Sequence, residues 1–234
     1  MIVNGETVTE IGTRVEPGDV VWFDGEPVEP EPLEYHLLNK PAGILSAASD
    51  ARGVRTVVEY VPSQVRLFPI GRLDRDTTGL IILTNDGALA HSLMHPRFEV
   101  DKVYRAHVLG EVTEEELDRL RQGVELEDGK TWPAEVQMTG TGMTGSGKKS
   151  GIDASAAGRK GVAGSGVAMS TVELVIHEGR KRQVRRMFDA IGHPVRGLHR
   201  KGYAMLTDRG LELGDSRPLA AKEVKALKRI AKGK

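Results

Sequence analysis

Two carboxylates stand close together in the stretch Phe68–Gly87, FPIGRLDRDTTGLIILTNDG. Asp74 and Asp76 lie between a Gly-Arg-Leu lead-in and the continuous apolar run Leu80–Leu83. A short continuous apolar run is consistent with a strand that is buried on both faces. The carboxylates are therefore expected in a polar loop that leads into a buried strand, where a rigid scaffold can hold a reactive side chain. On spacing alone, a turn or cap role for both is the commoner one.

Basic side chains gather further along the chain. Eight lie between positions 180 and 201, opposed only by Asp189, although the formal net charge of the whole chain is zero. Such a local excess suits contact with phosphate groups, although a charge run is more often just a solvated face. The eight are Arg180, Lys181, Arg182, Arg185, Arg186, Arg196, Arg200 and Lys201.

The elements that must position these residues follow from periodicity and capping signals. The spacing of Val184, Met187, Phe188 and Ile191 predicts a helix over Lys181–Ile191, with Arg182, Arg185 and Arg186 together on another face. Asp86 can cap a helix that runs to about Met94, and a Thr113/Glu116 capping box opens a helix to Gln122. A last amphipathic helix is expected over about Ala221–Ala231. Strands are expected at Glu34–Asn39, Lys102–Leu109, Ala134–Met138, Thr171–His177, Val195–Leu198 and Tyr203–Leu206.

Helices and strands that do not alternate regularly indicate an α+β fold. Residues 1–28 read as a small β-rich module, with Asn4-Gly5 as a hairpin turn. Glu26–Pro32, EPVEPEP, reads as an extended linker, so a second domain is expected over 29–234. Within it, residues 139–168 have a Gly/Ser-rich composition that predicts a flexible insertion, either a surface loop without a function or a tethered arm that touches RNA.

Several classes of function are excluded by what the sequence lacks. The chain has no cysteine, so disulfides and thiolate metal sites are impossible. It has no apolar run of membrane-spanning length, and its first ten residues do not resemble a signal peptide, so we expect a cytoplasmic protein. Neither a GxGxxG motif after a strand nor a GxxxxGK[ST] loop occurs, and the histidines are scattered, so neither a cofactor nor a metal is expected.

Four motifs in a fixed order carry a resemblance to a known family. They are LNKPAG (38–43), GRLDRDTTGLIILTNDG (71–87), KVYRAHV (102–108) and EGRKRQVRRMFDAIGHPV (178–195). Together they resemble the bacterial ribosomal RNA pseudouridine synthases of the branch that contains the RsuA and RluB enzymes. Residues 194–201 and the C-terminal helix are nearer to the large-subunit, RluB-like members. The resemblance implies a mixed, largely antiparallel central sheet with flanking helices and a central cleft. Residues 1–28 resemble the second half of an S-four-like RNA-binding module whose helical first half is absent here.

The resemblance also implies an activity and roles for individual residues. A uridine of ribosomal RNA would be flipped out of its stack and isomerised to pseudouridine. Asp74 would be the catalytic carboxylate, acting either as a nucleophile on the glycosidic carbon or as a base on the ribose 2′ proton. Asp76 would fix the loop, and Tyr104 would stack on the uracil. Because a buried carboxylate needs a nearby cation to stay charged, Arg185 is expected to pair with Asp74, with Arg186 as the alternative.

The expected RNA contacts are Arg72, Arg75, Lys102, Arg180, Lys181, Arg182, Arg186 and Arg200. The expected partner is ribosomal RNA of the large subunit, bound by a monomer without a small-molecule cofactor or a membrane. Two other functions stay open on the sequence. One is a non-catalytic RNA-binding factor for ribosome assembly that retains the fold, and the other is a hydrolase that excises uracil.

Overall fold

The structure is a computed structural model that describes residues 1–16, 18–143 and 166–233. The chain forms two compact units, Met1–Leu33 and Glu34–Lys234. This division falls later than the boundary expected after residue 28. The reason is that Glu26–Val28 pairs with the strand that precedes it, and so belongs to the first unit rather than to an extended linker.

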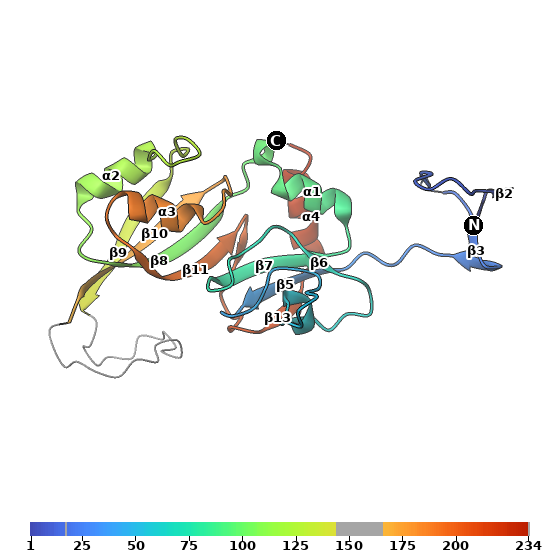
Figure 1. Cartoon of the computed structure of the whole chain (residues 1–234), viewed down its shortest axis with the longest axis horizontal. Helices are drawn as coiled ribbons and strands as arrows, with labels where there is room; N and C mark the ends of the chain where they lie inside the picture. The colour runs from blue at the N-terminus through green and yellow to red at the C-terminus, as the bar shows by residue number, and fades with distance from the viewer. Residues whose placement is uncertain (17, 144–165, 234) are drawn as a thin grey trace. The chain divides into compact units, whose positions relative to one another are not determined.

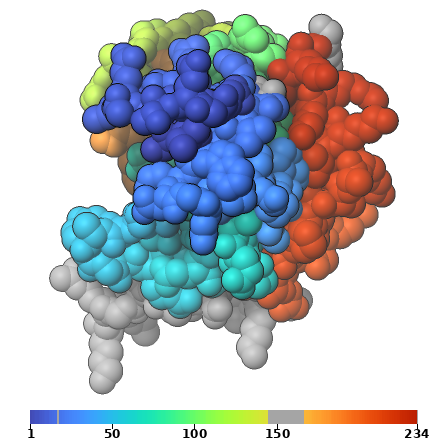
Figure 2. All heavy atoms as spheres, turned by 90° about the vertical axis from the view of Figure 1, so that its right-hand side faces the viewer, coloured from blue at the N-terminus to red at the C-terminus, as the bar shows by residue number. Residues whose placement is uncertain are grey.

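The first unit is a small antiparallel sheet with the strand order β2-β1-β3-β4. Asn4 and Gly5 connect its first two strands with φ angles of 52° and 88°, and positive values at both positions are what a type I′ hairpin turn requires. The predicted hairpin is therefore confirmed. Several large apolar side chains of this unit, drawn in blue in Figure 2, are exposed, including those of Trp22 and Phe23. The strands are β1 Ile2–Val3, β2 Glu6–Thr7, β3 Val21–Phe23 and β4 Glu26–Val28.

In the described residues, the second unit is built on a nine-stranded sheet. Its order is β13-β5-β7-β11-β8-β10-β9, with β6 beside β7 and β12 beside β11. Each described pair is antiparallel except β7 with β11, so the expected α+β class with a largely antiparallel sheet is confirmed. The strands are β5 Tyr35–Lys40, β6 Phe68–Pro69, β7 Thr78–Thr84, β8 Lys102–Leu109, β9 Glu135–Met143, β10 Ala168–Ile176, β11 Val195–Tyr203, β12 Leu206–Thr207 and β13 Ser216–Pro218.

The two halves of this sheet meet where β7 runs parallel to β11. The junction is short: Thr78 pairs with His199, and Gly79 pairs with Arg200. Gly79 has a φ of 113°, and a Cβ atom there would lie 2.3 Å from the backbone oxygen of Arg200. Only glycine tolerates both that backbone angle and that approach. The close approach places Arg200 directly beside the start of the buried run in β7.

Strand β7 is buried on both faces, as its continuous apolar run predicts. Leu80 and Ile82 belong to the core that also contains residues of α1 and α4, whereas Ile81 and Leu83 belong to the core that contains residues of α2 and α3. Figure 1 shows α2 and α3 over the β8–β10 side of the sheet, and α1 and α4 next to each other over the β7 side. The helices are α1 Gly87–Met94, α2 Glu114–Gln122, α3 Gln183–Ala190 and α4 Ala221–Ile230, and the short 3₁₀ helices are η1 Val57–Tyr60 and η2 Pro96–Phe98.

Local capping chemistry explains where α1 and α2 begin and where α3 ends. The carboxylate of Asp86 accepts a hydrogen bond from the backbone N–H of Leu89 at 2.9 Å, which caps α1 as predicted. The predicted capping box of Thr113 and Glu116 opens α2. Helix α3 ends at Ala190, and Gly192, whose φ is 89°, follows its C-cap; the N–H groups of Gly192 and His193 bond to the oxygens of Asp189 and Phe188, a pattern that commonly closes helices.

Strand β9 extends into the stretch that was expected to be a flexible insertion. Residues 140–143 pair with residues 168–171 of β10. The expectation of a flexible segment that starts at 139 is therefore wrong at its start, because backbone pairing holds these small residues although their side chains bury little. At the other end of the expected insertion, Ala168 already belongs to β10, and residues 144–165 lie outside the described residues. None of the helices in the described ranges is long and apolar enough to span a membrane.

Candidate active site

The side chain of Lys40 holds the loop that carries Asp74 through hydrogen bonds to the loop backbone. This side chain is fully buried at the end of β5, and its Nζ donates to four backbone oxygens. Three of them belong to the loop: those of Asp74 at 3.2 Å, Arg75 at 3.3 Å and Thr77 at 2.8 Å. The fourth belongs to Pro41. Burial lowers the pKa of Lys40 to about 8, although Asp76 and Asp74 oppose that shift.

The segment after Lys40 holds the same loop from its other side. Gly43 donates its N–H to the backbone oxygen of Arg75 at 2.7 Å, and the Nε of Arg75 donates back to the Gly43 oxygen at 3.0 Å. Ser46 exchanges two hydrogen bonds with the backbone of Leu73. The residues on both sides of Asp74 are thus fixed, so its side chain projects from a rigid support.

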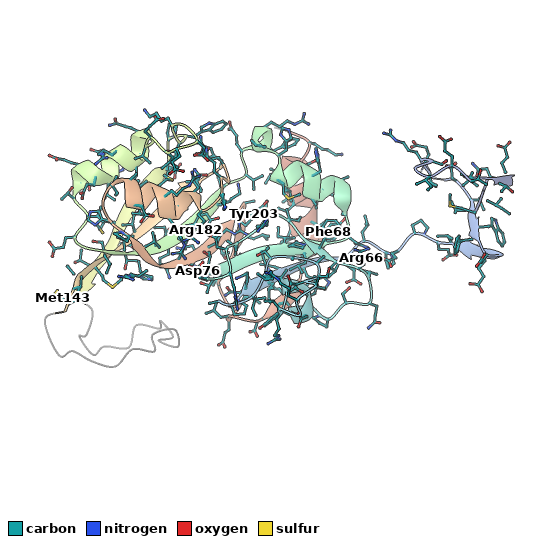
Figure 3. All side chains as sticks on the ribbon, in the orientation of Figure 1. Arg66, Phe68, Asp76, Met143, Arg182 and Tyr203 are labelled. Atoms are coloured by element: carbon teal, nitrogen blue, oxygen red, sulfur yellow. The ribbon has the colours of Figure 1, made fainter. Side chains whose placement is uncertain are left out.

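The two carboxylates of the loop have different cationic partners. An oxygen of Asp74 lies 3.7 Å from the Nη1 of Arg182, whereas Asp76 pairs with the Nη2 of Arg185 at 2.8 Å. Arg182 also lies 3.9 Å from Asp76, and Figure 3 shows these two side chains near each other. The expected pairing of Asp74 with Arg185 is therefore not what the structure shows. Arg186, the expected alternative, pairs with Asp128 through two bonds of 2.9 Å.

The reason for this exchange of partners lies at the start of α3. The helix was expected from Lys181, but it begins at Gln183, and Arg182 precedes it in a left-handed conformation with a φ of 51°. Arg182 therefore leaves the helix surface and reaches the Asp74 side of the loop. Arg185 is 7% exposed, and its Nη1 donates to the backbone oxygen of Val195 at 3.2 Å.

A cleft of about 980 Å³ opens beside Asp74. Its wall combines the Asp74 loop, the end of α1, β8, the segment before α3, and β11. The ring of Tyr104 from β8 lines it and is 8% exposed, and Tyr203 from β11 lines it as well. Lys102 also lines the cleft, and its Nζ donates to two backbone oxygens. Burial, reinforced by the neighbouring charge of Arg200, lowers the pKa of Lys102 to about 8.

The expected basic face is smaller than the sequence indicated. Arg185 and Arg200 are buried, and Lys201 pairs with Glu173 at 2.8 Å. The guanidinium group of Arg180 donates hydrogen bonds to the carboxylate of Glu178 and to the backbone oxygens of Gly129 and Lys130. The predicted RNA contacts that line the cleft are Arg72, Lys102, Arg180, Lys181, Arg182 and Arg200, whereas Arg75 and Arg186 do not line it. Exposed guanidinium and ammonium groups at its rim come from Arg72, Lys181 and Arg182.

Two contributions to the site escape sequence reasoning. Lys40 reads as a turn residue before Pro41, and the one signal of its burial is its position at the end of an apolar strand. Arg182 reads as a phosphate contact on a regular helix, and nothing in the sequence marks its left-handed backbone. In the described part of the chain, no cluster of three or more His, Asp or Glu side chains forms a metal site.

Comparison with known proteins agrees with this geometry. Residues 34–190 match the family model described as RNA pseudouridylate synthase. The chain is 44% identical over 230 residues to ribosomal large subunit pseudouridine synthase B of Bacillus subtilis, covering 98% of this chain and 85% of that protein. It is also 44% identical over 223 residues to an uncharacterized RNA pseudouridine synthase of Mycobacterium leprae, covering 92% and 75% of the two chains.

The fold has a counterpart among solved structures. The crystal structure of a pseudouridylate synthase matches with a TM-score of 0.67 and 30% sequence identity, covering 97% of this chain and 87% of that one. These relatives are named as synthases, so they give no support to a non-catalytic assembly factor that retains the fold. The matched model, the identity over nearly the whole chain and the shared fold establish that this chain belongs to the RNA pseudouridylate synthase family.

Proposed function

We propose that this pseudouridine synthase acts on ribosomal RNA of the large subunit and that Asp74 is its catalytic carboxylate. The substrate follows the Bacillus subtilis relative, whose name specifies the large ribosomal subunit. One observation carries the assignment of Asp74: its carboxylate lines the cleft on a loop whose backbone is fixed on both sides, whereas Asp76 does not line the cleft.

The chemistry requires a carboxylate at the sugar and a surface for the base. Asp74 acts either on the glycosidic carbon as a nucleophile or on the ribose 2′ proton as a base, and its side chain is 33% exposed and so accessible to a ribose. The ring of Tyr104 offers the base an aromatic wall inside the same cleft. Arg182 is positioned to compensate the charge of Asp74.

The target uridine must leave its stack before its sugar reaches the cleft, which costs a few kcal/mol. Exposed cations around the opening can offset that cost through phosphate contacts. Arg72, Lys181 and Arg182 are the exposed cations that line the cleft, so we assign them this role. The members of the basic run that are buried, or that are paired within the protein at hydrogen-bond distance, have no part in it.

Release of tritium from ribosomal RNA labelled at uracil carbon 5 tests the proposal. The native protein is expected to release tritium, and Asp74→Asn is expected to lower the single-turnover rate by about 10³-fold or more while RNA still binds. Asp76→Asn is the matched control, with a much smaller loss. Release that persists in Asp74→Asn would contradict the assignment, and free uracil among the products would indicate a hydrolase instead.

A second measurement tests the substrate. Pseudouridines are mapped in both ribosomal RNAs from cells with and without this protein, and the missing modification is expected in the large-subunit RNA. If the native gene restores the missing pseudouridine and the Asp74→Asn gene does not, that modification depends on Asp74 in the cleft. A missing modification in the small-subunit RNA would overturn the choice of substrate and leave the activity intact.

A further inference from the structure

Arg200 lines the cleft, and one nitrogen of its buried guanidinium group has no hydrogen-bond partner in the described residues. Arg200 is 2% exposed, and its Nε donates to the backbone oxygen of Leu80 at 2.7 Å. Its Nη1 lies 3.5 Å from the hydroxyl of Tyr104. In the described residues, its Nη2 is buried and has no hydrogen-bond partner. A buried donor without an acceptor costs free energy, so this group is well placed to take an acceptor from a ligand.

Several contacts hold this guanidinium rigidly. The β7–β11 junction at Gly79 fixes the backbone of Arg200, and the bond to Leu80 fixes the side chain. The ring of Tyr203 lies 5.2 Å from the Cζ atom, within the range of a cation–π contact. A donor that is fixed before the substrate arrives needs no reorganisation during the reaction. The arrangement is therefore suited to stabilising charge rather than to following a mobile RNA backbone.

The reaction creates negative charge on the base. When the C1′–N1 bond breaks, its electron pair stays with uracil and spreads onto the ring nitrogen and the two carbonyl oxygens. The ring then presents carbon 5 to C1′, the new C–C bond forms, the proton on carbon 5 leaves to a base, and the freed ring nitrogen N1 takes up a proton. The exchange neither gains nor loses electrons overall, so no oxidant or reductant is required.

We propose that Arg200 is a further catalytic residue, whose Nη2 donates to a carbonyl oxygen of the flipped uracil and stabilises the anion formed when the glycosidic bond breaks. This inference rests on the proposed function of the cleft. The wall around Arg200 includes the buried side chains of Tyr104, Tyr203 and Leu198, which suit a base, beside the ammonium group of Lys102. A phosphate there would lose most of its hydration, whereas the exposed cations at the rim can bind phosphate in water.

Two substitutions of Arg200 and one control separate binding from chemistry. Arg200→Lys keeps the positive charge but loses the planar donor, and Arg200→Met removes both. Arg196→Met is the matched control, because Arg196 is exposed on the same strand and does not line the cleft. Each protein is measured for its RNA dissociation constant and for its single-turnover rate of tritium release, on an RNA fragment that the native enzyme modifies.

The proposal predicts a loss in rate with little change in binding. Both Arg200 variants are expected to lose about 10²-fold in rate, the usual cost of removing one donor to a developing anion, with affinity changed less than about threefold. The Arg196→Met control is expected to keep the native single-turnover rate and the native RNA dissociation constant. An affinity loss at an unchanged saturating rate would assign Arg200 to a phosphate, and native values in both variants would also overturn the proposal. Absence of activity in the native enzyme would instead be a failure of the proposed function.

A last experiment leaves the protein unchanged, in case the variants do not fold. The target uridine is replaced by 2-thiouridine or 4-thiouridine, because sulfur is a weaker hydrogen-bond acceptor than oxygen. The native enzyme is expected to act about tenfold more slowly on one of the two analogues, and that analogue identifies the carbonyl that Nη2 contacts. Equal rates on uridine and both analogues would contradict the proposal.

Discussion

Asp74 differs from Asp76 in how strongly its carboxylate is already engaged. Asp76 bonds at 2.8 Å to Arg185, whose side chain is only 8% exposed, so this pair joins the loop to the body of α3. Asp74 has Arg182 at 3.7 Å, beyond ordinary hydrogen-bond length, and the side chain of Arg182 is 47% exposed. The oxygens of Asp74 therefore remain available to a ribose, which supports the division into a reactive carboxylate and an anchoring one.

Lys102 gives the cleft a charge that depends on pH. Its pKa is lowered to about 8 by burial, so the ammonium group loses its proton as the pH rises through that value. We expect Lys102 to contact RNA, and its protonated form is the one that attracts a phosphate. We therefore expect the dissociation constant for RNA to rise about tenfold above that pH, the order expected for one lost charged hydrogen bond. Fluorescence anisotropy with labelled RNA across a pH series measures this.

The Lys102→Gln variant is the control for that titration. It is expected to bind RNA more weakly below pH 8 and to show little further weakening above it. Lys40 titrates in the same range, but it is fully buried under the Asp74 loop, so RNA does not reach it. An equal pH dependence of the dissociation constant in the native protein and in Lys102→Gln would show that Lys102 is not the group whose titration weakens RNA binding.

At the scale of elements, the cleft depends on the parallel contact between β7 and β11. Gly79→Ala places a methyl group 2.3 Å from a backbone oxygen of β11 and strains a φ of 113°. Since the obstacle is backbone, the strands must separate. We expect a loss of at least about 3 kcal/mol in the free energy of unfolding, measured by urea denaturation.

Gly79→Ala is expected to destabilise the protein through backbone strain at a positive φ and through contact with the backbone of β11. Gly53→Ala measures the backbone strain alone. Gly53 has a φ of 72°, but a Cβ atom there would meet nothing within 4 Å. It therefore carries the backbone strain alone, for which about 1 kcal/mol is expected. Equal losses of stability in the two variants would show that the close approach of β11 does not limit residue 79.

Much of the element arrangement is predictable because its signals are local. The apolar run of β7, the Asp86 cap and the Thr113/Glu116 capping box are each encoded within a few residues, and each is present in the structure. The strand over residues 102–109 also follows from its alternation, with Tyr104 on the buried face. The register that makes β7 and β11 parallel neighbours depends on residues far apart in the chain, so local patterns do not contain it.

The ion pairs of the site were not predictable for a related reason. Helical periodicity treats the segment from Lys181 onward as one regular helix, and it places three arginines on a shared face. The left-handed backbone of Arg182 breaks that regularity and sends Arg182 and Arg185 to different carboxylates. The burial of Lys40 likewise depends on where the Asp74 loop folds back over β5. Such long-range contacts decide which charges are free.

At the scale of the whole molecule, positive and negative side chains are equal in number, but few of the positive ones are free to contact RNA. The chain has equal numbers of basic and acidic residues, and its basic run contributes fewer free cations than its sequence indicates. Around the cleft, exposed charge comes from Arg72, Lys181 and Arg182. By counterion release, three phosphate contacts make the logarithm of RNA affinity fall with a slope of about 2 to 3 against the logarithm of salt concentration.

Comparison of two multiple variants tests whether those three cations account for RNA binding at the cleft. Changing Arg72, Lys181 and Arg182 together to Gln is expected to lower the salt slope by about 2 to 3. Changing Arg180 and Arg186 to Gln, which removes cations already paired within the protein, is expected to lower it by less than about 1. A larger drop from the second variant would show that RNA displaces the internal partners of Arg180 and Arg186, and that the whole basic run acts as one face.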